Sequence, residues 1–80
     1  MRKTTTFEGK KRIFDTTKAE VQGTRAFSYY GDPAGYEEKL YKTKGGLYFV
    51  WGLGGADSPY GEGEDIRPLT EKEAKAWLAE

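Results

Sequence analysis

One stretch of this chain constrains the fold more than any other: two strand-favouring runs that flank a pair of glycines. The runs cover residues 38–44 and 47–51, and a short glycine turn between such runs is typical of a β-hairpin. If the two glycines alone form the turn, Leu40 faces Trp51, whereas a three-residue turn that starts at Lys44 shifts every pairing by one. The second run is apolar on both faces. We therefore expect it to be a central strand, or to meet a partner with one face.

The N-terminal part predicts a second hairpin. Two β-favouring runs, 4–7 and 10–14, flank Gly9, which can take the positive φ of a tight turn. Helix-capping residues then predict a short helix near residues 17–22. Residues 24–36 are rich in turn formers, so we expect a loop or a short irregular strand there.

The C-terminal part predicts a long loop, an edge strand and a helix. Residues 52–65 are too glycine-rich for a regular element, and long loops of this kind are often functional. Residues 66–69 can add a short edge strand, because Pro68 cannot donate to a ladder. Thr70 and Glu73 have the spacing of a capping box at the start of a helix. The residues that fall at helical spacing to pack one face of that helix are Ala74, Trp77 and Leu78.

Length and composition predict one domain that spans residues 1–80. A chain of 80 residues builds one modest core, and the aromatic residues, 15% of the chain, supply apolar area that the aliphatic residues lack. The predicted fold class is α+β. We expect a small antiparallel sheet of about four or five strands, made of two hairpins and the edge strand, with the two helices.

The absence of cysteine and histidine narrows the possible functions. Without them the usual zinc, haem and iron–sulfur ligand sets cannot be assembled, and a serine or threonine nucleophile lacks a histidine base. A small domain also has little concavity in which to bury a catalytic pair of carboxylates. No stretch has the apolar length of a membrane span. We expect a cytoplasmic, non-enzymatic protein with no cofactor and no membrane partner.

Four acidic residues lie in or beside the glycine-rich segment: Asp57, Glu62, Glu64 and Asp65. Carboxylates of loops can ligate Ca²⁺ or Mg²⁺, but the order of these four does not match a calcium loop. A solvated acidic loop without a metal is the better interpretation. A sharper alternative is a negative patch that mimics a phosphate backbone and occupies a nucleic-acid channel.

The tyrosines and tryptophans exceed what one small core encloses, and both residue types are favoured at interface hot spots. We expect Trp51 and Trp77 inside the core, and Tyr29, Tyr30 and Tyr60 as exposed contacts on loops. Together with the four acids, these three tyrosines form the predicted partner-binding set.

A basic N-terminal hairpin supports an alternative function. Residues 1–27 carry seven basic and three acidic side chains, and residues 28–80 carry six and ten, so the two parts have net charges near +4 and −4. Lys10, Lys11 and Arg12 could therefore contact nucleic-acid phosphates. Because the whole chain is neutral, a hairpin with a solvated polar face is the better interpretation, and direct nucleic-acid binding is the second choice.

The order of several segments resembles a family of short, mostly uncharacterised proteins encoded by phages and other mobile elements of bacteria. The segments are the basic hairpin that ends in Phe14-Asp15-Thr16-Thr17-Lys18-Ala19, the run 37–49, Gly52-Leu53-Gly54-Gly55 with Ser58 and Tyr60, and Ile66, Pro68-Leu69-Thr70 and Glu73-Ala74 with Trp77. The likeness spans most of the chain and departs from the pattern at residues 24–36.

This resemblance implies a function but no catalytic residues. Small mobile-element proteins of this kind include anti-CRISPR inhibitors, which bind a Cas protein or complex and block its access to DNA. The resemblance thus implies a protein or ribonucleoprotein partner in the cytoplasm of a bacterial host. Separately, an apolar two-faced strand next to a sheet edge would also allow identical chains to pair as a homodimer.

Overall fold

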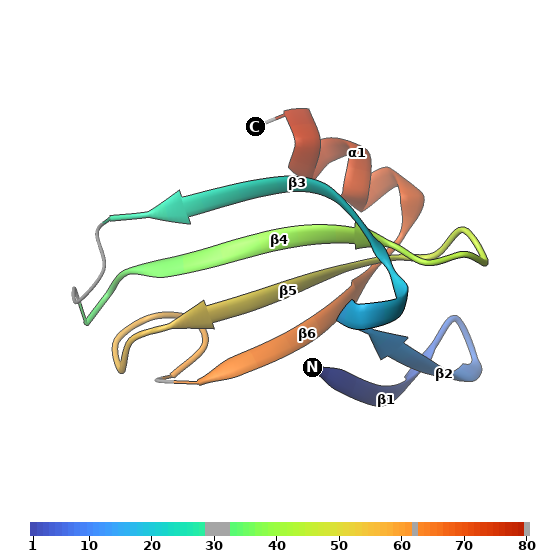
Figure 1. Ribbon diagram of the computed structural model, residues 1–80, viewed down its shortest axis with the longest axis horizontal. Helices are drawn as coiled ribbons and strands as arrows, with labels where there is room; N and C mark the ends of the chain where they lie inside the picture. Colours follow the sequence, from blue (N-terminus) through green and yellow to red (C-terminus); the bar gives the residue numbers. More distant parts are fainter. Residues whose placement is uncertain (29–32, 62, 80) are drawn as a thin grey trace.

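A computed structural model describes residues 1–28, 33–61 and 63–79, and it has the predicted α+β fold (Figure 1). In chain order the elements are β1 (Arg2–Phe7), β2 (Lys10–Asp15), the 3₁₀ turn η1 (Thr16–Lys18), β3 (Glu20–Phe27), β4 (Tyr36–Lys42), β5 (Tyr48–Gly54), β6 (Glu64–Leu69) and α1 (Glu71–Ala79). Strands β3-β4-β5-β6 form one antiparallel sheet, and β1-β2 form a separate hairpin. No helix within the described residues is long and apolar enough to cross a membrane.

The hairpin β4–β5 has the three-residue turn. Leu40 faces Val50, so the register that follows from a two-glycine turn is wrong and the alternative register is confirmed. Gly46 takes a positive φ of 87°, which glycine adopts without strain. Thr43 closes the turn, because its N–H donates to the Leu47 carbonyl at 2.8 Å and its Oγ1 accepts from the Leu47 N–H at 3.0 Å.

Strand β5 lies inside the sheet, as its apolar sequence predicts, since it pairs with β4 on one side and β6 on the other. Its side chains alternate between two cores. Val50 lies in the core under α1, and Phe49 lies in the core under the β1–β2 hairpin. Because β5 is internal, it offers no edge for pairing with a second chain; the predicted edge strand is β6.

Helix α1 covers part of one sheet face. The predicted capping box is present: Glu73 N–H donates to Thr70 Oγ1 at 3.1 Å, and Thr70 N–H donates to Glu73 Oε1 at 3.0 Å. Ala74 and Trp77 are buried, as expected, but Leu78 is 48% exposed. Leu78 nevertheless packs partly on the sheet, because its Cδ2 lies beside Gly23 of β3, next to the Trp77 ring.

The β1–β2 hairpin covers part of the opposite face. Glu8 and Gly9 both have positive φ, the backbone of a tight hairpin turn. Phe14 is fully buried, with its ring centroid 5.4 Å from that of Phe49. Trp51, predicted to be inside, is only half-buried, and its Nε1 donates to Glu64 at 2.9 Å.

Two predictions about residues 17–36 are only partly correct. The helix near 17–22 is a single turn, η1, capped by the Asp15 carboxylate, and the chain then pairs with β4 from Glu20 onward. Residues 20–27 form a full strand, with a bulge between Val21 and Gly23, where a loop or irregular strand was expected from residue 24. Most β3 side chains are exposed, so the strand lacks the alternating apolar pattern that would reveal it.

Candidate functional site

Two loops that are far apart in the sequence meet at one end of the sheet (Figure 1). The Gly55 N–H donates to the Gly35 carbonyl at 3.0 Å, and the Asp57 N–H donates to the Pro33 carbonyl at 2.8 Å. The approach requires glycine at position 55, because a Cβ there would lie 2.5 Å from the Pro33 carbonyl oxygen. We call this part of the molecule, residues 33–36 and 53–61 with Phe27, the loop end.

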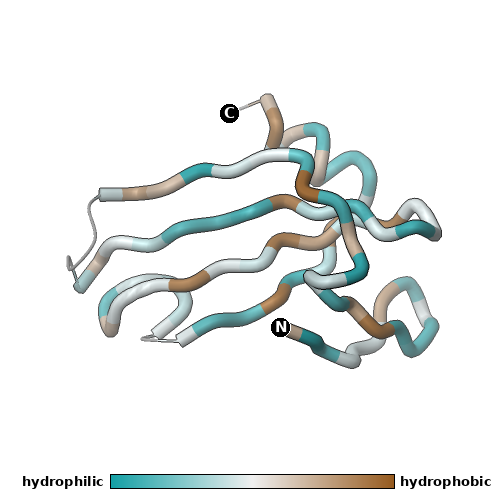
Figure 2. The backbone as a smooth tube through the Cα atoms, viewed as in Figure 1, coloured by the Kyte–Doolittle hydropathy of each residue, from teal (hydrophilic) through white to brown (hydrophobic). Residues whose placement is uncertain are grey.

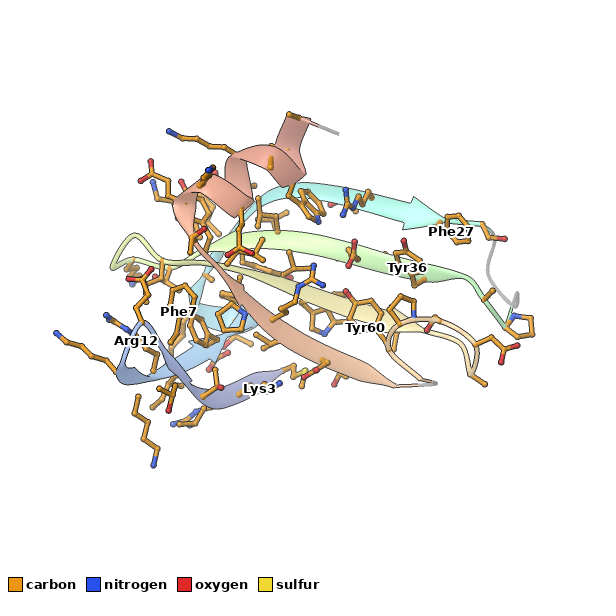
Figure 3. All side chains as sticks on the ribbon, turned by 180° about the vertical axis from the view of Figure 1, so that it is seen from behind. Lys3, Phe7, Arg12, Phe27, Tyr36 and Tyr60 are labelled. Carbon is orange, nitrogen blue, oxygen red and sulfur yellow. The ribbon has the colours of Figure 1, made fainter. Side chains whose placement is uncertain are left out.

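Three aromatic rings cross the loop end in succession (Figure 3). Phe27 stacks on Tyr36 with 5.3 Å between their ring centroids, and the ring centroids of Tyr36 and Tyr60 lie 6.1 Å apart. Phe27 is 55% exposed, while Tyr36 and Tyr60 are half-buried. Exposed aromatic area backed by packed rings is the composition of an interface hot spot.

Tyr60 holds the β5–β6 loop against the sheet. Its ring covers Gly52, where any Cβ would overlap the ring. The turn before it is fixed by Ser58, whose hydroxyl donates to the Gly55 carbonyl at 2.7 Å and accepts from the Tyr60 N–H at 3.2 Å. The glycine at position 52 therefore provides the space that lets this loop close onto β5.

Glu38 is the buried partner of this contact, with 5% of its surface exposed. The Tyr60 hydroxyl donates a short hydrogen bond to Glu38 Oε2, and Arg25 Nε donates to Oε1 at 3.0 Å. The Arg25 guanidinium also lies 4.4 Å above the Trp77 ring. One chain of contacts thus joins the loop to the sheet and the sheet to α1. We call the Tyr60–Glu38–Arg25 group the clasp.

The clasp shifts the pKa values of its two acidic groups, Glu38 and Tyr60, in opposite directions. Burial alone would raise the pKa of Glu38, but hydrogen bonds from Tyr60 and Arg25 outweigh it and lower the pKa below its usual value. Burial, and then the bond to the Glu38 carboxylate, raise the pKa of Tyr60 well above its usual range. Each Glu38 oxygen already accepts a hydrogen bond. Glu38 is therefore a structural anion and not a poised base.

We expect the clasp to make the protein sensitive to acid. Since the folded-state pKa of Glu38 is lowered from 4.5, its contribution to stability is present above that pH and is lost as the pH falls below it. In urea unfolding, the free energy of unfolding of the wild type should fall more steeply with falling pH than that of Glu38→Gln. The difference between the two slopes should correspond to at most about one proton per molecule. Equal slopes for the two proteins would contradict the assignment.

A cleft of about 400 Å³ lies beside the clasp. Its lining residues are Lys3, Arg25, Tyr36, Glu38, Pro59, Tyr60, Asp65, Ile66, Arg67 and Pro68. At its edge Lys3 Nζ donates to Asp65 Oδ1 at 2.7 Å and to the Ile66 carbonyl at 3.1 Å. The Lys3 hydrogen bond lowers the pKa of Asp65. The cleft thus carries both signs of charge next to aromatic rings.

The three predicted acids that the structure describes do not form one patch. Asp57 is exposed on the loop, and Asp65 is paired with Lys3 at the cleft. Glu64 adjoins Asp65 on β6 and so points to the opposite sheet face, where it accepts from Trp51. Glu62 lies outside the described residues.

Among the predicted tyrosines, only Tyr60 can be placed, since Tyr29 and Tyr30 lie outside the described residues. Tyr60 is half-buried, although an exposed contact was expected, because Glu38 binds its hydroxyl. Sequence patterns did not indicate the stack of Phe27 on Tyr36 or the pair Arg25–Glu38. A cross-strand pair of opposite charges would have indicated the last of these, had β3 been recognised as a strand.

The three basic residues of the alternative site do not share one face. Lys10 and Arg12 alternate with Lys11 along β2, so Lys11 points away from the other two. Arg12 is half-buried and points back toward the sheet (Figure 3), on the same side of β2 as the buried Phe14. Lys10 and Lys11 are exposed. The described residues contain no group of three or more acidic side chains arranged to hold a metal ion.

Comparison of the chain with models of known protein families, with curated proteins and with solved structures found no match. The functional assignment therefore depends on the geometry of the loop end and on its chemistry.

Proposed function

We propose that this chain is a non-enzymatic binding protein whose contact surface is the loop end. The observation that carries the proposal is the pair of hydrogen bonds that joins two loops, each expected to contact a partner, into one surface beside Phe27, Tyr36 and Tyr60. A surface ordered before binding loses less conformational entropy on association. The two carboxylates of the neighbouring cleft are already bound, Asp65 to Lys3 and Glu38 to Arg25 and Tyr60, which supports binding over catalysis.

Phe27 should be a hot spot of this surface. We expect Phe27→Ala to weaken partner binding by about 2 kcal/mol, or roughly thirtyfold, because the exposed ring is backed by Tyr36. Ile13→Ala is a matched control, since Ile13 is also 55% exposed but lies on the β1–β2 hairpin. The measurement is titration calorimetry with the partner that wild-type chain retains from a bacterial lysate.

Two results would count against the loop end as the contact surface. One is full affinity of the Phe27→Ala variant, and the other is an equal loss in Ile13→Ala. Removal of Phe27 leaves both core clusters intact, so circular dichroism of the variant should match the wild type.

The target class we propose is a Cas protein or Cas–guide complex in the cytoplasm of a bacterial host, with inhibition by blocked access to DNA. The resemblance to short proteins of phages and mobile elements supports this choice. Cleavage of target DNA by purified Cas–guide complexes should be inhibited by wild type and by Ile13→Ala, and much less by Phe27→Ala. If the wild-type chain at micromolar concentration inhibits none of the Cas–guide complexes tested, the Cas target is wrong. That result leaves the contact surface at the loop end open, because calorimetry tests it separately.

A further inference from the structure

A second and larger cleft opens at the end of the molecule opposite the loop end. Its volume is about 820 Å³. One wall is the stretch from η1 to the start of β3, residues 17–20, and the other is residues 42–44 at the β4–β5 turn. These two segments are brought together because β3 and β4 pair with Glu20 opposite Lys42.

Positive charge dominates the lining of this cleft. Lys18, Lys42 and Lys44 line it, against the single acid Glu20. None of the three lysines forms an ion pair with another described residue, and Lys42 Nζ lies over the Tyr48 ring, 5.6 Å from its centroid. Lys18 is near Asp15, whose pKa is lowered first by hydrogen bonds from Thr17 and then by the Lys18 charge. Their ammonium groups are therefore available to an anion.

The neighbouring hairpin adds to the positive field. Phe7, beside the β1–β2 turn, and Leu47, after the β4–β5 turn, pack against the same core cluster, so the two turns lie at one end of the molecule. Figure 2 shows hydrophilic stretches in both segments. Lys10 and Lys11 are exposed there beside one exposed acid, Glu8, so this turn carries a net positive charge. Clustered charge of one sign raises the local concentration of oppositely charged ligands.

We propose that this cleft binds a chain of linked phosphates. Three ammonium groups on two segments can contact several negative charges along one ligand, which suits a chain of phosphates better than a single anion. Lysine binds phosphate as a point charge. The lining contains no arginine, so point charges and not a bidentate fork would hold the ligand. The hydroxyl-bearing side chains of Thr17 and Thr43 are also in the lining. A nucleic-acid backbone and a free polyphosphate share this chemistry.

The test is an NMR titration of the ¹⁵N-labelled full chain with inorganic tripolyphosphate and, separately, with a single-stranded DNA oligonucleotide. Saturable shifts are expected at the amides of residues 17–20 and 42–44, and not at those of residues 55–61. The double variant Lys18→Gln/Lys44→Gln should weaken binding by about five- to tenfold, as expected for the loss of two phosphate contacts. Glu20→Gln removes the only acid of the lining and should strengthen binding.

The matched control is Lys39→Gln/Lys75→Gln, which removes the same charge from residues that do not line the cleft. Shifts with tripolyphosphate alone support a small polyphosphate as the ligand, and shifts with the oligonucleotide alone support a nucleic-acid backbone. Shifts with both support the shared chemistry. Three outcomes would overturn the proposal: no saturable shift with either probe, equal weakening in the control variant, or weaker binding by Glu20→Gln. None of them bears on the loop end.

Discussion

Replacing Phe14 with alanine should remove a large part of the protein's stability. Phe14 is fully buried and its ring contacts those of Phe7 and Phe49, so it connects the β1–β2 hairpin to the sheet. Phe→Ala in a core costs about 3–5 kcal/mol. The total stability of a domain of this size is only about 4–12 kcal/mol. One truncation can therefore remove most of it.

Ile13→Ala is the control, because Ile13 adjoins Phe14 but points to the other side of the hairpin and is 55% exposed. We expect it to change stability by less than about 1 kcal/mol. The measurement is urea unfolding followed by tryptophan fluorescence. If Phe14→Ala unfolds with a midpoint close to that of Ile13→Ala, the hairpin does not pack on the sheet in the way described.

Replacing Glu38 with alanine is the second large effect that we expect. The change removes the acceptor of both the Tyr60 hydroxyl and Arg25 Nε. Breaking a fully buried ion pair costs about 3–5 kcal/mol. Because the Arg25 side chain is 35% exposed, we expect about 2–4 kcal/mol here. The loss should be accompanied by faster amide exchange at Gly55 and Asp57, since the β5–β6 loop loses its anchor.

Glu37→Ala is the control for this change. Glu37 is exposed and points to the opposite sheet face, so its removal should be almost neutral. The readouts are urea unfolding and hydrogen exchange of the loop amides. A Glu38→Ala variant with wild-type exchange at Gly55 and Asp57 would show that the clasp does not hold the loop.

The parts of the fold that could be predicted are those encoded by local patterns. The glycine turn and the two-faced apolar run predict the β4–β5 hairpin and the central place of β5, and Thr70 with Glu73 predicts the start of α1. Strand β3 could not be predicted in this way. As an edge strand with mostly exposed side chains, it carries no apolar alternation to mark it.

The candidate site was predictable only in part. The glycine-rich segment indicates a functional loop, and Tyr60 within it is one of the predicted contacts. The role of Tyr60 depends on Glu38, which lies 22 residues away. Nothing local indicates that pair, because it forms only when the β5–β6 loop closes over Gly52. A sequence window reports local periodicity and not contacts of this kind.

The proposed surface requires that Tyr60 and Glu38 hold the loop against the sheet in solution. NMR of ring-labelled tyrosines from pH 7 to pH 12 tests this most directly. The Tyr60 ring signal should stay that of a neutral phenol past pH 10.0, the ordinary tyrosine pKa, and Glu38→Gln should lower its titration midpoint. A Tyr60 midpoint near 10.0 in the wild type would contradict the clasp, and with it the single surface at the loop end.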